Sequence, residues 1–525
     1  MTEISALQRC LDDPGYTPPR AELPKLLASL VELDEDSVAR VERCLLSAGW
    51  PAAELACSAL SDASPAQRAR LYSLLGRFAS GQADARLFDV FIAGLADDSE
   101  RCRRLAASSL GKLGDVRAEP HLLAALDPTQ LGLARVVVEA LGKVGSDRAV
   151  SALDALSTSD AELGRRLTRA RLLLARRLRR NEASTLVLDR RLPARQRVLF
   201  ECRRGLVDLL ADELAALSPQ KRSATTVEIA HEGTLAELLL ARTALHCGLL
   251  VPLDSGPSPA KRIAAALARP ATVSALQAWT QGPVRLRLEF QEAGHQRALA
   301  WAIAEELSRL APSLVNDPRG PTFTVFAHAD ADADSELLLV PRLDPDPRFS
   351  FRKRDVPAAS HPTIAAALAR IAGASADDVV WDPFMGSGLE LIERARLGPY
   401  ARLIGTDIDP RALGAARENL NGASVSRVEL VRADALTFTP RGVTLILTNP
   451  PMGRRVARDG TIAELLERFV EHAASVLPRG GRVVWLSALD RRTESAARRA
   501  GFSVASGPEV DLGGFSARVQ VFSRR

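Results

Sequence analysis

The chain has 525 residues, of which 46% are hydrophobic and 25% charged, a composition typical of several soluble globular domains. The longest apolar stretch, residues 234–253, is interrupted by Glu237, Arg242 and His246, and the N-terminus lacks the apolar core of a secretory signal. We therefore expect a cytoplasmic protein that does not bind a membrane. The six cysteines form no CxxC pair, which argues against a zinc site, and the net charge of +5 permits an anionic partner without requiring one.

The first predicted domain, residues 1–182, contains an internal repeat. Three segments align around Leu75-Gly76-Arg77, Leu110-Gly111-Lys112 and Leu141-Gly142-Lys143, and a degenerate fourth copy covers residues 166–177. Each copy predicts an amphipathic helix, and helix pairs that cannot bury an apolar face alone stack on their neighbours. The pattern resembles short HEAT repeats over residues 50–180. This implies an all-α solenoid and a possible docking surface for a protein partner, with an ordinary helical bundle as the alternative.

An arginine-rich stretch follows at the end of the repeats. Because the planar arginine side chain suits phosphate oxygens, the stretch predicts either a phosphate-binding stripe or a solvated helix face. The two interpretations are equally supported. The arginines are Arg165, Arg166, Arg169, Arg171, Arg176, Arg177, Arg179, Arg180, Arg190, Arg191, Arg195, Arg197, Arg203 and Arg204.

From about Ser184 the pattern changes to short strand-like runs between helical ones, which predicts an α+β domain over residues 183–347. The run at residues 284–290 alternates apolar and charged residues, as a half-buried antiparallel strand does. Strands are expected at residues 185–188, 197–201, 226–229, 284–290, 322–327 and 337–340, and helices at residues 206–217, 235–246 and 296–310.

The last part, residues 348–525, alternates strands and helices, and this predicts a doubly wound parallel sheet. Helices are expected to begin near Leu389, Pro410 and Ile462, with a closing hairpin between residues 501 and 522. The expected strands cover residues 379–381, 403–406, 428–431, 444–447 and 482–486.

Motifs at the ends of the first three of these strands outline a site for an adenosine-containing cofactor. The first is a glycine-rich turn, residues 382–388, where the backbone can approach a ligand closely. Asp407 ends the second strand and is placed to accept hydrogen bonds from ribose hydroxyls. Asp434 ends the third and can meet the amino group of adenine. Each aspartate alone could instead cap a helix, and Asp409 before Pro410 is expected to do so.

The fourth strand ends in Thr448-Asn449-Pro450-Pro451-Met452-Gly453, which suits methylation of an exocyclic amine of a nucleobase. Such an amine is a poor nucleophile because its lone pair is delocalised into the ring. The Asn449 side-chain oxygen and the Pro450 carbonyl can accept its two N–H groups and so turn the lone pair toward a methyl donor. Two successive prolines fix the direction of that carbonyl. Positioning and preorganised dipoles supply most of the catalysis, so no metal ion is expected.

With these motifs, residues 350–525 resemble the Rossmann-fold RNA methyltransferases that modify guanine N2, a group that often carries a THUMP domain. The middle region is similar to a THUMP module. The resemblance implies S-adenosyl-L-methionine as cofactor and tRNA or rRNA as substrate, with the THUMP-like region docking the RNA and residues 360–372 closing over the methionine end of the cofactor. The implied catalytic residues are Asn449, Pro450, Pro451 and Met452. The implied cofactor-binding residues are Pro362, Thr363, Asp382, Phe384, Gly386, Ser387, Gly388, Asp407, Ile408, Asp434, Ala435 and Asn449.

Two positions depart from the family pattern. Met452 stands where the family usually has a tyrosine or phenylalanine that stacks on the target base, and Leu389 replaces a common threonine. The HEAT-like region is not a usual part of the family. Two alternatives stay open: a DNA methyltransferase acting on adenine or cytosine amines, and a non-catalytic scaffold with a vestigial cofactor site. Arg454 and Arg455 are equally suited to holding a phosphate beside the target base and to simple exposure.

Overall fold

A computed structural model describes residues 6–13, 15–30, 32–81, 85–179, 182–291, 296–328, 335–357, 359–452 and 461–525. It divides into two compact units, residues 1–183 with 301–320 and residues 184–300 with 321–525. The borders predicted from the sequence, after residues 182 and 347, stay predictions. Within the described ranges, no helix is both long and apolar enough to cross a membrane.

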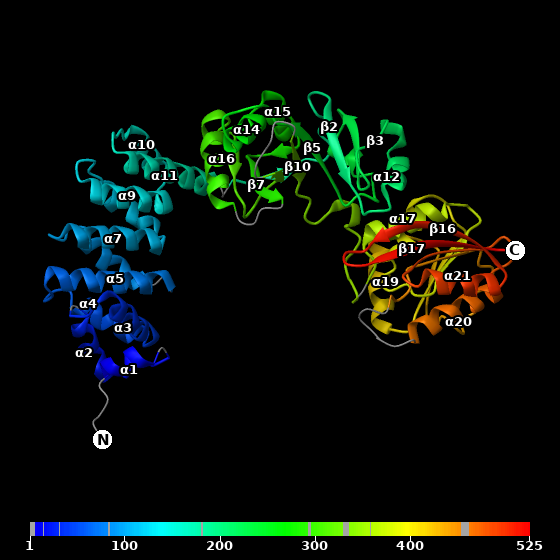
Figure 1. Ribbon diagram of the computed structural model, residues 1–525, viewed down its shortest axis with the longest axis horizontal. Coiled ribbons are helices and arrows are strands. Elements are labelled where there is room, and N and C mark those ends of the chain that lie inside the picture. Colours follow the sequence, from blue (N-terminus) through cyan, green and yellow to red (C-terminus); the bar gives the residue numbers. More distant parts are fainter. Residues whose placement is uncertain are drawn as a thin grey trace, which may run out of the picture. The chain divides into compact units, whose positions relative to one another are not determined.

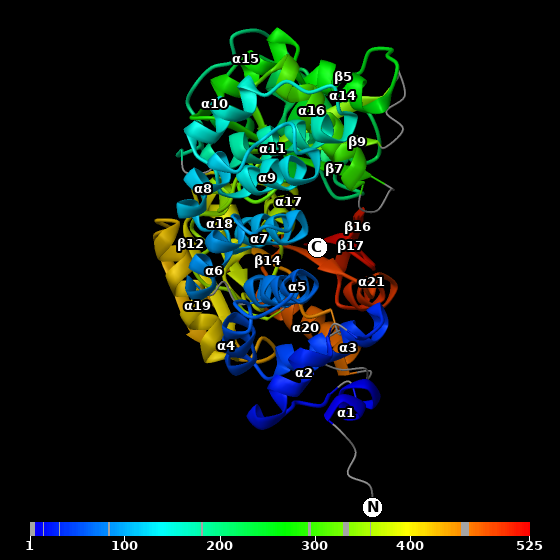
Figure 2. The same cartoon turned by 90° about the vertical axis from the view of Figure 1, so that its left-hand side faces the viewer.

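The first unit is a stack of helices with one continuous apolar core. Figure 1 shows α5, α7 and α9 lying one above another, and Figure 2 shows α4, α6, α8 and α10 along one side of that row. The four predicted repeat copies fall in α5, α7, α9 and α11. The helices are α1 (Ala6–Asp12), α2 (Leu23–Ser29), α3 (Glu35–Ser47), α4 (Trp50–Ser58), α5 (Pro65–Gly81), α6 (Phe88–Gly94), α7 (Glu100–Leu113), α8 (Glu119–Ala124), α9 (Leu131–Val144), α10 (Asp147–Ala155) and α11 (Ala161–Arg179).

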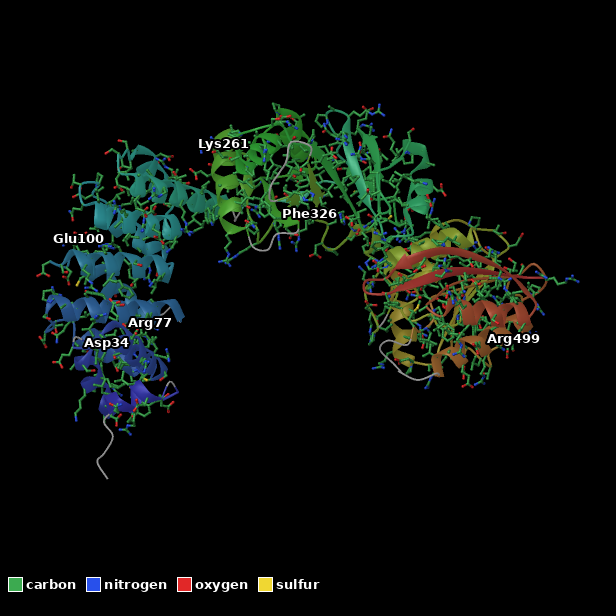
Figure 3. The ribbon with its side chains drawn as sticks, viewed as in Figure 1. Asp34, Arg77, Glu100, Lys261, Phe326 and Arg499 are labelled. Carbon is green, nitrogen blue, oxygen red and sulfur yellow. The ribbon has the colours of Figure 1, made fainter. Side chains whose placement is uncertain are left out.

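The glycine shared by the first three repeat copies lies inside its helix and lets the helices of successive repeats approach closely. A Cβ atom added to Gly111 on α7 would lie 3.0 Å from the Ala140 Cα atom of α9. One added to Gly142 on α9 would lie 2.8 Å from the Ala170 Cα atom of α11. The same contact thus recurs one repeat later, which explains the recurring Leu-Gly-Lys pattern. Side chains also link neighbouring helices, as where Arg77 of α5, labelled in Figure 3, donates to Glu42 of α3.

The middle region contributes a sheet in which strands β3-β4-β2-β5-β10-β9-β7 lie in that order. The strands are β1 (Thr185–Leu186), β2 (Gln196–Glu201), β3 (Gln220–Lys221), β4 (Thr226–His231), β5 (His246–Pro252), β6 (Thr280–Gln281), β7 (Val284–Gln291), β8 (Leu314–Asn316), β9 (Phe323–His328) and β10 (Glu336–Pro341). The helices are α12 (Val207–Glu213), α13 (Leu235–Leu238), α14 (Pro259–Leu267), α15 (Pro270–Ala278) and α16 (Arg297–Leu310).

Two sequence-based expectations for this region are wrong. The helix expected at residues 235–246 is confined to α13, and the following apolar run forms β5, whose residues 247–251 are all buried. A strand buried on both faces reads as a continuous apolar run, which periodicity cannot separate from a buried helix. Strand β7 pairs parallel with β9, not antiparallel. Its alternating pattern reports partial burial and carries no information about the direction of the partner.

The C-terminal region forms a sheet of seven strands in the order β13-β12-β11-β14-β15-β17-β16. The first five strands are parallel, and β17 runs antiparallel to both β15 and β16. The strands are β11 (Val379–Asp382), β12 (Arg402–Asp407), β13 (Val428–Arg432), β14 (Leu445–Thr448), β15 (Arg482–Ser487), β16 (Phe502–Asp511) and β17 (Ser516–Arg524). The helices are α17 (Pro362–Ala372), α18 (Leu389–Arg396), α19 (Pro410–Gly422), α20 (Thr461–Val476) and α21 (Asp490–Arg499). The predicted strands and closing hairpin are thus confirmed.

The strand order of this sheet reverses at β11. The chain runs outward from β11 through β12 to β13 and then returns to place β14 on the other side of β11. In such sheets, ligands bind outside the carboxyl ends of the strands at the point where the order reverses. On one face Trp381, Phe469 and Trp485 pack into an aromatic core with α20 and α21. Strands β11 and β14 pair in parallel, which places their carboxyl ends side by side.

Within the second unit, ionic contacts join the middle sheet to the C-terminal region. Arg242 donates from Nε and Nη2 to the two carboxylate oxygens of Glu393 on α18, each at 2.6 Å, and Glu393 is 2% exposed. Glu213 pairs with Arg370 of α17 at 3.6 Å. A buried two-point ion pair resists separation strongly, since removing either partner leaves an uncompensated charge. The middle sheet therefore has a defined position against α17 and α18.

Candidate active site

The glycine-rich turn after β11 is held against the end of β12. Gly386 and Gly388 have φ angles of 50° and 82°, a conformation that residues with a side chain rarely adopt. The Gly386 N–H donates to Asp407 Oδ2 at 3.1 Å, and the Asp409 N–H donates to Asp407 Oδ1 at 2.9 Å. Each Asp407 oxygen thus holds one backbone N–H and keeps a further lone pair for a ligand.

A buried asparagine on α19 supports the same turn, and the sequence reasoning missed it. Asn419 Nδ2 donates to the Ser387 carbonyl at 3.0 Å and to the Arg354 carbonyl at 2.7 Å. Its Oδ1 accepts the N–H groups of Lys353 and Arg354 at 2.8 and 3.0 Å. Asn419 therefore ties the segment before α17 to the turn. A polar residue at a buried position of a helix was the only sequence signal.

Three polar atoms at the switch between β11 and β14 are buried and find no hydrogen-bond partner among the described residues: Asp382 Oδ2, Ser387 Oγ and Asn449 Oδ1. The other Asp382 oxygen accepts from Thr448 Oγ1 at 2.6 Å, which links the two strand ends directly. Buried polar atoms rarely lack partners, so three together indicate groups that a ligand satisfies. These atoms and the glycine turn fit a polar, adenosine-containing cofactor.

The remaining part of the Asn449 side chain is held by a hydrogen-bond chain. Asn449 Nδ2 donates to Ser360 Oγ at 2.8 Å, and Ser360 Oγ donates to Glu390 Oε1 at 2.5 Å. Glu390 lies in the first turn of α18 and is 3% exposed. The sequence reasoning did not select Glu390. The available signal was a single charge within Leu389-Glu390-Leu391-Ile392, at the start of an otherwise apolar helix.

Two buried carboxyl groups lie close together at this site, and both have raised pKa values. Burial is the main cause that raises the pKa of Glu390 to about 7. Burial and the negative charge of Glu390 raise the pKa of Asp382 well above its usual range. A carboxyl group is charged above its pKa, so Glu390 carries its charge above about pH 7 and loses it as the pH falls.

The other predicted residues lie at or near the same edge. Pro362 and Thr363 are buried in the first turn of α17, which His361 caps. Phe384 packs edge-on against Phe469 with ring centroids 5.2 Å apart. Ile408, which follows β12, is 68% exposed.

The loop after β13 and the segment after β14 complete this edge. Asp434 is exposed and accepts the Leu436 N–H at 2.9 Å, while Ala435 is buried beneath it. Pro450 is buried, and Pro451 and Met452 are partly exposed. Gly453, Arg454 and Arg455 lie outside the described residues.

The arginine-rich stretch does not form one uniform stripe. Arg165 and Arg166 pair with Glu162, and Arg197 pairs with Glu228 at 2.7 Å. Arg177 donates to the Lys143 and Gly145 carbonyls at 3.0 and 2.9 Å, where it caps the end of α9. These arginines have structural roles. Arg195 and Arg204 are exposed, and the side chains of Arg176, Arg179 and Arg180 lie outside the described part of the chain.

Comparison with known proteins matches two parts of the chain to families. Residues 350–517 match the RMKL-like methyltransferase domain, and residues 53–135 and 88–173 match HEAT repeats, which confirms the predicted repeat type.

The tRNA (guanine(6)-N2)-methyltransferase of Thermus thermophilus is 31% identical over 334 residues, which cover 61% of this chain and 97% of that protein. The U6 snRNA (guanine-N(2))-methyltransferase of Bos taurus is 28% identical over 236 residues, or 44% of this chain and 43% of that protein. The crystal structure of TrmN from Thermus thermophilus has 28% identity and a TM-score of 0.49, covering 63% of this chain and all of that one.

Proposed function

We propose a function from one premise: the chain belongs to the family of the S-adenosyl-L-methionine-dependent tRNA (guanine-N2)-methyltransferases. From it we infer that this chain methylates the exocyclic N2 amine of a guanine in tRNA or rRNA. The single observation that carries the proposal is the Asn449 side chain, whose Oδ1 is buried without a partner in the described structure at the carboxyl end of β14. An acceptor held free at this point suits the N–H group of a target amine.

In this mechanism the chain positions groups and needs no chemical change of its own side chains. Asn449 Oδ1 and the Pro450 carbonyl accept the two N–H groups of the amine, so that its lone pair points away from the ring plane. S-adenosyl-L-methionine, when bound, would supply an electrophilic methyl group whose bond to sulfur breaks as the N–C bond forms, and the methylated amine would release one proton to water. Holding the amine and the methyl group in line converts a bimolecular step into one within a complex, which accounts for most of the acceleration.

The proposed cofactor contacts follow the edge of the sheet. Asp382 Oδ2 and Ser387 Oγ, both buried without partners among the described residues, suit the polar methionine end. Asp407 suits the ribose because each of its oxygens keeps a free lone pair beyond its backbone contact. The exposed Asp434 suits the adenine amino group. The other residues that the resemblance implied stay part of this proposal.

RNA docking is proposed for the middle region and the basic end of the repeats. Residues 1–100 carry 9 Lys and Arg against 16 Asp and Glu, whereas residues 101–183 carry 16 against 9. Phosphate contacts favour the second half. The Arg242–Glu393 ion pair supports the transfer of binding energy from the middle sheet to the catalytic site, because it gives the sheet a defined position there. A protein partner of the repeats stays a prediction.

The proposed function is tested with the purified full chain, isotopically labelled S-adenosyl-L-methionine, and total tRNA, rRNA or duplex DNA, followed by nucleoside mass spectrometry. Labelled N2-methylguanosine from RNA is expected. Asn449→Ala should lower turnover by about 100-fold or more, as loss of a key acceptor does, while the cofactor Kd changes less than about twofold. Label in DNA adenine or cytosine, or no cofactor binding at all, would contradict the proposal.

The docking proposal is tested by charge reversal at Arg195 and Arg204, which are exposed. The double variant should bind tRNA more weakly, and the slope of log affinity against log salt should decrease by about one per lost phosphate contact. Arg20→Glu is the control, since Arg20 is also exposed but lies within residues 1–100, the acidic part of the repeats. Equal salt slopes in the double variant and the unmodified protein would exclude these two arginines from the RNA interface.

A further inference from the structure

We propose that Ser360 and Glu390 are positioning residues that hold the Asn449 amide group in the one orientation that presents Oδ1 to the substrate. The inference rests on the proposed function for the identity of the amine. It goes beyond that function in assigning a role to two residues that contact neither the amine nor the methyl group.

The need for such a device follows from the shape of an amide. The oxygen and the NH₂ group of an asparagine side chain have nearly the same size, so a half-turn exchanges an acceptor for two donors without a steric penalty. If Nδ2 of Asn449 faced the amine, donor would meet donor and the amine could not be held. Catalysis therefore depends on which of the two orientations is populated.

The hydrogen-bond chain selects the orientation through the single proton of Ser360. An ionised carboxylate can only accept, so the hydroxyl of Ser360 must donate to Glu390. Only the oxygen lone pairs of Ser360 then remain for Asn449, and a lone pair accepts from Nδ2 but not from Oδ1. The observed bond from Asn449 Nδ2 to Ser360 Oγ, at 2.8 Å, is the one that this logic requires. Oδ1 is left for the ligand.

The surroundings of Glu390 show that its carboxylate is not explained by stability. It is 3% exposed, and the charge that acts on this carboxyl group is a repulsive one, from Glu393 on the same helix. Glu393 is itself paired with Arg242, and Ser360 is the partner of the Glu390 side chain. A buried charge held by a hydroxyl and the start of a helix, with no basic partner among the described residues, is costly. A leucine would suit this position better unless the charge has a function.

The same logic predicts an unusual ranking of variants. In Glu390→Leu, the Ser360 hydroxyl loses its acceptor and donates instead to Asn449 Oδ1, so the wrong orientation is favoured. One hydrogen bond in favour of the wrong amide orientation leaves about a tenth of the molecules in the productive orientation. The value of kcat should therefore fall by about tenfold. In Ser360→Ala no group selects either orientation, and two equal populations lower kcat only by about two- to threefold. The double variant should return to the Ser360→Ala level, above Glu390→Leu alone.

Acidity should reproduce the effect of Glu390→Leu in the unmodified protein. As the pH falls through the pKa of Glu390, which burial raises to about 7, the carboxyl group gains a proton and can donate to Ser360. The Ser360 hydroxyl then turns toward Asn449 Oδ1. The value of kcat at saturating RNA and cofactor should therefore fall on the acid side of pH 7, and this part of the profile should be absent in Glu390→Leu.

The decisive experiment measures kcat, KM and the pH profile for Ser360→Ala, Glu390→Leu and the double variant of the full chain. It adds an NMR readout without cofactor or RNA, in which the ¹⁵N side-chain amide signal of Asn449 is assigned by its loss in Asn449→Ala. This signal should shift with pH near neutrality in the unmodified protein and not in Glu390→Leu. KM should change little. Ser360→Thr, which keeps a hydroxyl, should retain near-normal kcat, and Glu467→Gln, on α20 where Glu467 pairs with Arg492, is the control.

The outcomes are distinct. A double variant with kcat no higher than that of Glu390→Leu would overturn the proposal, because removal of the misdirected Ser360 hydroxyl must then restore activity. A pH-independent Asn449 signal would overturn it as well. Melting temperature provides a further check, since Glu390→Leu should unfold no earlier than the unmodified protein. If no RNA is methylated at all, the proposed function fails while the NMR titration still decides whether Ser360 and Glu390 orient Asn449.

Discussion

The repeat region and the catalytic region differ in how far apart in the sequence their contacting residues lie. In the repeats, each close contact joins residues about one repeat apart, as where Gly111 meets Ala140 and Gly142 meets Ala170. In the catalytic region, Asn449 and Ser360, which form a hydrogen bond, lie 89 positions apart in the chain. In the repeats, one short-range contact recurs at a fixed spacing. In the catalytic region, the contact forms only when the whole sheet is folded. Damage should therefore stay local in the repeats and spread through the site in the catalytic region.

The largest effect is expected from removing a buried ion pair of the catalytic region. Arg394 of α18 is 0% exposed and donates to Asp378 Oδ2 at 2.8 Å, and Asp378 is 3% exposed. Arg394→Ala leaves that carboxylate buried with only Arg482 to balance it, so we expect a loss of about 3–5 kcal/mol of unfolding free energy. Calorimetry of the full chain should show only the unit with residues 184–300 and 321–525 melting earlier. The exposed pair Arg165–Glu162 provides the control, and Arg165→Ala should leave both melting temperatures unchanged.

A smaller, local effect is expected from a side chain between two repeats. Gly142→Leu places a Cβ atom 2.8 Å from the Ala170 Cα atom, so α9 and α11 must move apart. Overpacking of this kind costs about 1–3 kcal/mol. Hydrogen exchange followed by mass spectrometry should show faster exchange in α9 and α11 and an unchanged exchange rate in the catalytic sheet. Changes that reach β11 or β14 would contradict the idea that damage in the repeats stays local.

The third test compares two aspartates that are two residues apart. Asp407→Ala should weaken S-adenosyl-L-methionine binding about tenfold, or about 1.4 kcal/mol, because charge-assisted hydrogen bonds to the ribose and to the Gly386 N–H are lost. Asp409 caps α19 by accepting the Arg411 N–H at 2.9 Å. Asp409→Ala should therefore keep the cofactor affinity. Titration calorimetry measures both cofactor affinities. Equal losses of affinity in the two variants would contradict the proposal that Asp407 binds the ribose.

The smallest effect is expected from a glycine of the repeats that makes no close contact. A Cβ atom added to Gly164 on α11 would have nothing within 4 Å. Gly164→Ala should stabilise the repeat unit by about 0.5–1 kcal/mol, because alanine favours the helix and no neighbour has to move. Opposite signs for Gly164→Ala and Gly142→Leu, measured by melting temperature, would show that packing decides the role of each glycine. The same sign in both would argue that helix propensity alone is at work.

Patterns in the sequence were sufficient where a feature is local. The repeat of Leu-Gly followed by Lys or Arg predicted the helices α5, α7 and α9, and the glycine turn before Leu389 marked the end of β11 and the start of α18. They failed for β5, where residues 247–251 are buried on both faces and lose the alternation that identifies a strand. They failed again for the partner of β7, since one strand's pattern does not record the direction of its neighbour.

The sequence by itself predicted the type of chemistry, because the acceptor groups proposed for the target amine stand in consecutive residues, Asn449 and Pro450, after a strand. It also determined the repeat architecture, whose contacts recur at a fixed spacing. Only the tertiary structure decided which atoms of Asn449 are occupied and which are left for a ligand. Ser360 and Glu390 reach Asn449 because α17, α18 and β14 meet at the strand switch point, and no pattern along the chain encodes that meeting. Local order follows from short-range propensity, whereas the orientation of one amide depends on hydrogen bonds between distant segments that exist only after the sheet has formed.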